Sequence, residues 1–204
     1  MNTQKQATPD HPIHELLTKR WSPYAFAERP VTNEDLRSLF EAARWAPSSY
    51  NEQPWSYIVA KKEDKEAFQQ MLSCLVEGNQ EWAQAAPALA LGCTSLKFSR
   101  NDKPNAAALH DLGLASANLT FEATARDMFV HQMIGILPDK ARELYDIPED
   151  VQPLTGLAIG YAAEPDNLSE KYKERDTTAR ERKPLSEFIF SDSWGTASEL
   201  AKNR

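Results

Sequence analysis

The chain has 204 residues, of which 41% are hydrophobic, enough to bury the core of one ordinary domain or of two very small ones, which excludes a disordered chain. Asp and Glu number 30 against 23 Lys and Arg, so the formal net charge is −7. Such a surface repels phosphate backbones, so no nucleic-acid partner is expected. No apolar run approaches the ~20 residues of a membrane span, and the first residues lack the apolar core of a signal peptide. We therefore expect a cytoplasmic protein with no membrane contact.

Several common chemistries have no sequence support. Cys74 and Cys93 stand apart without a Cys-x-x-Cys motif, and His11 and His14 have no further ligand near them, so neither a disulfide nor a metal site is expected. There is no Gly-x-Gly-x-x-Gly, no P-loop and no Gly-x-Ser-x-Gly. Any nucleotide-like ligand must be held without a glycine-rich loop, and hydrolysis by an activated serine is not indicated.

The first half of the chain predicts alternating helices and strands. Thr32 fits a helix N-cap, with Asp35 three residues on as in a capping box. Pro47 disfavours helical geometry at the residue before it, and turn-forming residues follow as far as Pro54. The predicted elements are helix 11–19, helix 33–45, strand 55–60, helix 63–75, a helical piece through Trp82 after a break at Gly78–Asn79, and strand 88–93.

The second half begins with the longest predicted helix, 105–126, which is rich in small residues that would let another helix approach closely. Beyond it we expect an extended or irregular stretch over 129–136, a helix over 139–145 and a strand over 153–162. The remainder is polar and charged, and we interpret it as an arm that reaches over a neighbour. One mixed helix-and-strand domain is predicted over 11–195, between flexible segments 1–10 and 196–204.

Three polar clusters could carry chemistry. Arg20 and Ser22 would project to one side of an extended segment, where they could hold an anion, although an arginine after a helix is also a common surface charge. The loop 47–54 offers hydroxyls, an amide and free backbone N–H groups to a polar heterocycle, or is simply a surface turn. Arg180, Arg182 and the next lysine could chelate a phosphate, or form a solvated basic turn.

Two histidine motifs are weaker. His110 and Asp111 are adjacent in a predicted helix, so they should face different directions and make a poor catalytic pair. His131 lies in an apolar stretch, where a satisfied core or interface histidine is the expected role.

Taken together, these motifs resemble the FMN-dependent nitroreductase family. The resemblance runs from about residue 11 to 195. Its most specific part is the Ala-Pro-Ser-Ser-x-Asn-x-Gln-Pro-Trp block that ends at Trp55, and weaker matches support it by their order: Arg20-Trp21-Ser22-Pro23, Asn79-Gln80-Glu81-Trp82, His131-Gln132-Met133 and Arg182-Lys183-Pro184-Leu185.

The resemblance implies an α+β fold with a central mixed or antiparallel sheet flanked by helices. It also implies a homodimer in which extended termini wrap the partner and FMN lies at each subunit interface. The implied contacts to the phosphate and ribityl region of FMN are Arg20, Ser22 and Tyr24, and Arg180 and Arg182 would also contact the phosphate. The implied contacts to the ring are Pro47, Ser48, Ser49 and Asn51, and the equivalents of Ser48 and Ser49 commonly come from the opposite subunit. Asn79 and Trp82 would lie at or near the ring, and Ile134 and Gly135 toward its N5 and O4 edge.

Two positions depart from the family pattern. Tyr24 stands where the family usually has Arg or Lys, so one phosphate or ribityl contact is expected to be missing or replaced by a phenol. Asp127 occupies a position where glycine is usual, which requires aspartate to adopt left-handed geometry.

The function implied by the resemblance is a two-electron oxidoreductase. NADPH or NADH would pass a hydride to flavin N5, and a small-molecule acceptor such as a nitroaromatic or a quinone would then use the same site in ping-pong fashion, so no protein side chain is assigned as catalytic. The alternative is a non-catalytic FMN-binding protein of the same fold, such as a flavin store or a stress-related partner. The motifs do not identify the physiological acceptor or the preferred reductant.

Overall fold

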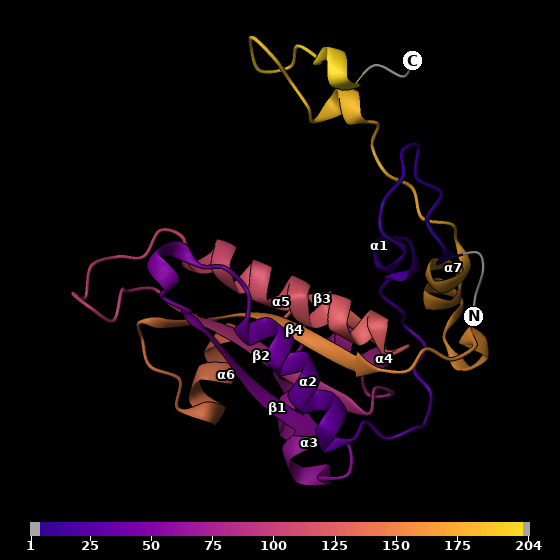
Figure 1. The fold of residues 1–204 in the computed structure, drawn as a ribbon. Coiled ribbons are helices and arrows are strands. Elements are labelled where there is room, and N and C mark those ends of the chain that lie inside the picture. Colours follow the sequence, from indigo (N-terminus) through magenta and orange to yellow (C-terminus); the bar gives the residue numbers. More distant parts are fainter. Residues whose placement is uncertain (1–4, 202–204) are drawn as a thin grey trace.

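The computed structural model describes residues 5–201 and is built on one four-stranded sheet (Figure 1). The strands are β1 (Trp55–Lys61), β2 (Ala88–Ser95), β3 (Phe129–Met133) and β4 (Val151–Gly160), in the order β1-β2-β4-β3. Every neighbouring pair is antiparallel. The three predicted strands are thus confirmed with small changes at their ends, and the extended stretch after the long helix becomes the edge strand β3.

Helices cover both faces of this sheet. One face packs against α2 (Asn33–Arg44) and α5 (Ala108–Ala125), and the other against α3 (Lys65–Ser73), α4 (Glu77–Ala83) and α6 (Pro138–Tyr145). Strand β2 is buried on both faces, which explains its continuous apolar sequence. The capping box is confirmed because the Thr32 hydroxyl accepts from the Asp35 N–H at 3.0 Å.

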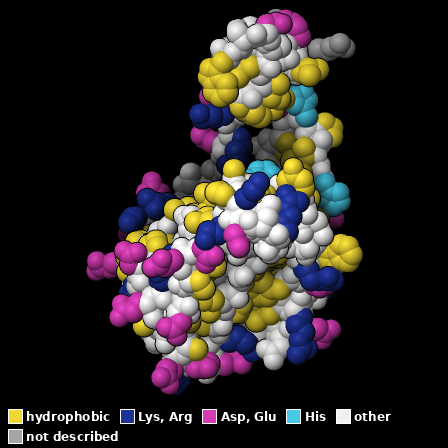
Figure 2. Space-filling view, turned by 90° about the vertical axis from the view of Figure 1, so that its left-hand side faces the viewer, with side chains coloured by type: hydrophobic (Ala, Val, Ile, Leu, Met, Phe, Trp, Pro, Cys, Tyr) yellow, Lys and Arg dark blue, Asp and Glu magenta, His cyan; other side chains and the backbone are white. Residues whose placement is uncertain are grey.

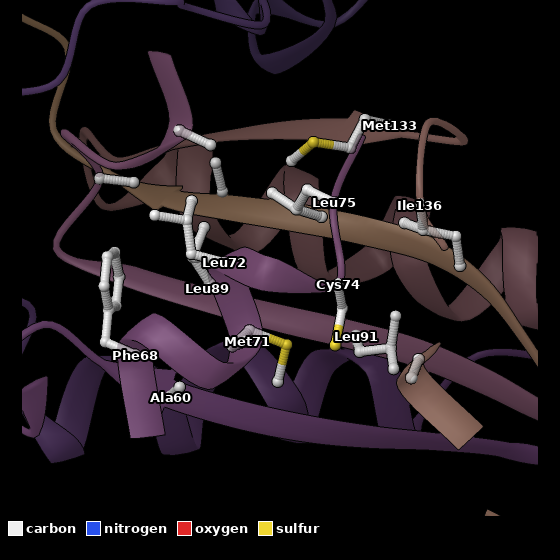
Figure 3. Packing of buried hydrophobic residues seen from close by; sticks show 14 of the residues in the cluster. Ala60, Phe68, Met71, Leu72, Cys74, Leu75, Leu89, Leu91, Met133 and Ile136 are labelled. Carbon is white, nitrogen blue, oxygen red and sulfur yellow. The ribbon is translucent and has the colours of Figure 1, made fainter. Parts of the chain in front are cut away.

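The core between the sheet and α3 joins residues that are distant in the sequence. Phe68, Met71 and Leu72 project from α3, while Leu89 and Leu91 reach them from the buried strand β2 (Figure 3). All five are buried. This packing holds α3 and the chain that follows it, including α4, against the sheet.

The predicted helix break at Gly78–Asn79 is wrong, because both residues lie inside α4. The chain leaves helical geometry earlier, where Val76 is extended and its N–H donates to the Gly135 carbonyl at 3.1 Å. An isolated bridge between Leu75 and Ile136 fixes the same break. Tertiary pairing with the turn after β3 therefore decides where the helix ends.

Two predicted helices are shorter in the structure. Helix α1 spans Glu15–Lys19 instead of 11–19, and His14 caps it by accepting from the Leu16 N–H. Helix α5 begins at Ala108 instead of 105, because the Asn105 side chain accepts from a backbone N–H and holds a turn there. Asp127 has a φ of 56°, so the left-handed geometry expected at this position is confirmed.

The polar C-terminal part was expected to be an arm, but it begins with a further helix, α7 (Glu170–Thr177), that packs on the body. Its Tyr172 is buried and donates a hydrogen bond to the Gly78 carbonyl in α4. The sequence conceals this helix because only Tyr172 and Asp176 are buried on an otherwise charged segment.

Cations from opposite ends of the chain cap the terminal helices. Lys5 Nζ lies 2.6 Å from each of two carbonyl oxygens at the C-terminal end of α7. Arg180 in turn donates to the carbonyls of Thr18 and Arg20 at the C-terminal end of α1. Carbonyl groups at a helix C-terminus lack intrahelical partners and favour positive charge, so each cap ties one end of the chain to the other.

A buried carboxylate completes this connection. Asp176 is 1% exposed, and its Oδ1 accepts from the Tyr24 N–H at 2.7 Å, whereas its Oδ2 has no hydrogen-bond partner. Burial raises the pKa of Asp176 above its ordinary 3.8, while hydrogen bonds from the Tyr24 and Ala25 N–H groups and the charge of Lys5 oppose this rise. The carboxylate therefore positions the segment Arg20–Tyr24 against α7.

Beyond α7 the chain runs outward to a small C-terminal unit (Figures 1 and 2). A bridge between Phe190 and Ala197 closes it, yet Trp194 is 94% exposed and Leu200 is 82% exposed. No helix among the described residues is long and apolar enough to cross a membrane. The division into segments 1–10, 11–195 and 196–204 stays a prediction, of which residues 1–4 and 202–204 lie outside the described part.

We predict that Asp176→Asn makes the protein more stable than the wild type at pH 7. The pKa of Asp176 is higher in the folded protein than in the unfolded chain, so the protonated side chain stabilises the fold. This stabilisation is fully present below the unfolded pKa and is lost as the pH rises through the native pKa. Asparagine keeps the acceptor for the Tyr24 N–H without the buried charge. Urea unfolding at several pH values should show the advantage at pH 7 shrinking as the pH falls toward 3.8; an equal loss of stability at every pH would contradict this account.

Candidate functional site

The loop 47–54 is held in a strained backbone conformation between α2 and β1. Tyr50, Asn51 and Gln53 all have φ between 53° and 56°, although none of them is glycine. The Ser48 hydroxyl helps to hold this shape by accepting from the Gln53 N–H at 3.0 Å. Non-glycine residues in left-handed geometry cost free energy and are often found at functional sites, which fits a loop shaped for a ligand.

A buried acid at the start of α5 anchors the same loop. Asp111 is 2% exposed, and its Oδ2 accepts from the Ser49 N–H at 3.0 Å. The expectation that His110 and Asp111 face apart is wrong, because His110 Nδ1 lies 3.2 Å from Asp111 Oδ1. The histidine side chain is exposed, so the pair supports the loop and does not form a buried catalytic couple. Sequence reasoning missed this anchor; the available signal was one acid among the small and apolar residues of the long helix.

At the other end of the molecule, Arg20 and Ser22 do lie together, with 3.4 Å between Arg20 Nη1 and Ser22 Oγ. His131 Nδ1 lies 2.9 Å from the Pro23 carbonyl oxygen and holds this segment against β3. Burial lowers the pKa of His131, and the Arg20 charge lowers it further, although the hydrogen bond to Pro23 opposes both. His131 is half-buried and has a hydrogen-bond partner, which agrees with the prediction of a satisfied core or interface histidine.

Tyr24 and Trp82 lie behind this segment in an aromatic cluster. The Tyr24 ring centroid is 4.7 Å from that of His131 and 5.1 Å from that of Trp82 and from that of Tyr172. Trp82 is buried. The Tyr24 phenol is therefore packed among rings and does not extend from the segment as an arginine or lysine could. For both residues, contact with a cofactor stays a prediction, and the structure shows that they support the segment from beneath.

Asn79 and Gly135 meet beside this cluster. Asn79 Nδ2 donates to the Gly135 carbonyl at 2.9 Å. A Cβ at position 135 would lie 2.5 Å from Asn79 Nδ2, so only glycine allows α4 to approach the turn this closely. The neighbouring Ile134 is 70% exposed at the tip of the turn. The structure thus brings together three of the residues that the resemblance assigns to the flavin ring.

The basic C-terminal segment meets Arg20 in a cleft of about 980 Å³. Arg20, Arg180, Arg182 and Lys183 line it together with the acidic Asp10 and Glu181, so cations are in excess. Burial lowers the pKa of Arg20 and of Arg180, and the Arg182 charge lowers both further. Among the described residues, none of these three arginines forms an ion pair with a carboxylate, so their repulsion favours a bound anion.

Two groups of predicted site residues, those of loop 48–51 and of segment 20–22, lie toward opposite ends of α5. Asp111 contacts Ser49 near its N-terminal end, whereas Thr124 near its C-terminal end lines a cavity with Trp21, the neighbour of Arg20. The two helix positions are thirteen steps apart in the sequence, a distance of about 20 Å along the axis. The same separation is visible in Figure 1, where the loop before β1 lies at the far end of the sheet from α1 and α7. One chain therefore does not bring Ser48, Ser49 and Asn51 to the arginine cleft.

Comparison with solved structures agrees with this fold. A structure described as an oxidoreductase containing FMN superimposes with a TM-score of 0.86 at 33% sequence identity, covering 92% of this chain and 95% of that one.

Sequence comparison gives the same result. A putative NADH dehydrogenase/NAD(P)H nitroreductase of Archaeoglobus fulgidus is 28% identical over 72% of this chain and 83% of its own length. An FMN reductase [NAD(P)H] of Bacillus subtilis is 31% identical over 74% of this chain and 66% of its own. The nitroreductase family model matches residues 17–161, more than half of the chain. The chain therefore belongs to the nitroreductase family.

Proposed function

We propose that the protein is an FMN-dependent NAD(P)H oxidoreductase that transfers two electrons to a nitroaromatic, a quinone or a related small acceptor in ping-pong fashion. The observation that carries this proposal is the cleft in which Arg20 and Arg182 repel each other and, within residues 5–201, have no carboxylate partner. The family of the chain, and the relatives named for FMN and NAD(P)H, support the same assignment.

The cleft fits the phosphate end of FMN. Arg20 and Arg182 carry charge and fork-shaped donors suited to phosphate oxygens, and Ser22 adds a hydroxyl beside Arg20. Arg180 fits a different role from the expected one, because its two terminal nitrogens already donate to backbone carbonyls. We infer that Arg180 holds Arg20 in place and adds charge to the cleft, while Arg20 and Arg182 contact the phosphate.

The other proposed contacts fit a flat polar ring. Asn79 and the turn at Ile134 and Gly135 would hold one edge of the isoalloxazine, and the loop with Ser48 and Asn51 would lie against it. When bound, FMN would supply the hydride chemistry. The protein would orient the ring and place cations near the phosphate, so no acid or base from a side chain is required.

We further propose that a second copy of the chain completes each site. The two groups of residues lie about 20 Å apart along α5 in one chain, and two α5 helices packed antiparallel would bring opposite groups together. Leu109 is 45% exposed on this helix, and a Cβ added at Gly113 would meet no atom within 4 Å, so this face is open to a neighbour. The exposed Trp194 and Leu200 of the C-terminal unit would gain burial against the same partner.

The first test is an absorbance spectrum of the purified protein. We expect flavin bands that bleach when NADPH or NADH is added without oxygen and return when a nitroaromatic or quinone follows. Flavin bands without turnover would support instead a flavin-binding protein with no catalytic role. A colourless protein that does not rebind FMN would refute the cofactor assignment.

We predict that Arg182→Gln weakens FMN binding about tenfold, since it removes one charge-assisted contact to phosphate. Riboflavin, which lacks the phosphate, should bind the variant and the wild type equally. Fluorescence titration of the apoprotein measures both affinities, and Arg37→Gln, which changes an exposed arginine on α2, is the matched control. Equal weakening of FMN and riboflavin would show that Arg182 does not contact the phosphate.

A mixing experiment tests whether the site is shared between chains. Arg20→Ala and Asn51→Leu should each lose most activity alone, because each damages both sites of its own homodimer. After the two variants are unfolded and refolded together, about a quarter of all sites should be intact, since half of the dimers are mixed and each mixed dimer has one undamaged site. Mixing without any recovery would place the whole site within one chain.

A further inference from the structure

A second cationic feature lies at the opposite end of α5 from the arginine cleft. The Arg100 guanidinium carbon is 4.1 Å from the ring centroid of Tyr50 and 5.0 Å from that of Phe98. The two rings are also in contact, with their centroids 5.9 Å apart in an edge-to-face arrangement. Stacking on two rings restricts a side chain that is otherwise very flexible.

The loop that carries Arg100 is itself ordered. A bridge between Lys97 and Pro104 closes it, and the Phe98 N–H donates to the Lys103 carbonyl at 2.9 Å. Glu52 joins it to the loop 47–54 by accepting from the Ser99 N–H at 2.6 Å. Arg100 therefore keeps a fixed position relative to the residues on either side of Tyr50.

The donors of Arg100 are free. Among residues 5–201, no hydrogen-bond acceptor or ion-pair partner is found for its guanidinium. The Glu52 carboxylate is nearby: hydrogen bonds from Ser99 are the main cause that lowers the pKa of Glu52, and the Arg100 charge lowers it further. Lys97 and Lys103 add two cations to the same loop against the one acid Asp102. Figure 2 looks onto this end of the molecule and shows Lys and Arg side chains gathered near its centre, on a chain whose net charge is −7.

We propose that Arg100 binds the 2′-phosphate of NADPH and so gives the enzyme a preference for NADPH over NADH. This inference rests on the proposed function, because Tyr50 stands between Ser49 and Asn51, the residues assigned to the ring of the flavin. Because the Arg100 loop contacts Tyr50 and Glu52, it borders the loop where a reductant stacked on that ring would lie. A phosphate monoester carries close to two negative charges at pH 7, which matches a loop with three cations better than a single carboxylate would. The stacked guanidinium presents its donors in the geometry that phosphate requires.

The test compares Arg100→Met, Arg100→Lys and the control Arg37→Met. With a neutral quinone as acceptor, we expect Arg100→Met to raise the KM for NADPH about tenfold and to leave the KM for NADH unchanged. Arg100→Lys, which keeps the charge but loses the fork-shaped donors, should fall between. Equal changes for both reductants, or a wild type that does not discriminate between them, would overturn the proposal.

A binding measurement separates this inference from the proposed function. Calorimetric titration with adenosine 2′,5′-bisphosphate and with adenosine 5′-monophosphate requires no turnover. The wild type should bind the bisphosphate more tightly, and Arg100→Met should abolish the difference. If the protein lacks flavin and activity but this difference is present, the proposed function fails while the phosphate site stands; turnover without the difference refutes only the role of Arg100.

Discussion

The structure depends on how the two ends of the chain are tied together. The carbonyls that end α1 and α7 have no helical partners, and each set is satisfied by a cation from the opposite end of the chain, Arg180 or Lys5. Asp176 adds a buried acceptor for the Tyr24 backbone. Because the arginine cleft consists of residues more than 150 positions apart in the sequence, it exists only while these contacts hold.

The second constraint is the length of α5. The helix places the strained loop around Tyr50 at one end and the arginine cleft at the other, each held by its own contacts with the body. Asp111 anchors the first group, and His131 anchors the segment of the second. Each group is therefore held by contacts within the chain, which would lower the ordering cost of binding a ligand there. Their separation makes assembly of two chains part of the proposed chemistry.

Local sequence signals predicted local structure well where nothing else competed. The capping box at Thr32 and Asp35 begins α2 as expected, and the continuous apolar run became the doubly buried strand β2. The helix break predicted at the glycine of α4 was wrong, because the turn after β3 pairs with Leu75 and Val76 and places the break before α4. Helix α7 was missed because its burial is confined to two side chains on a charged segment.

The sequence by itself determined the fold class, the family resemblance and the residue types of the proposed site, since hydrophobic period, caps and motif order are local properties of the chain. Only the tertiary structure decided that Arg180 caps a helix, that Asp111 holds the Ser49 loop and that Arg100 stacks on Tyr50. These roles depend on which distant backbone groups and rings lie within a few ångströms of a side chain. No spacing along the sequence encodes that proximity, because packing of the sheet and its helices creates it.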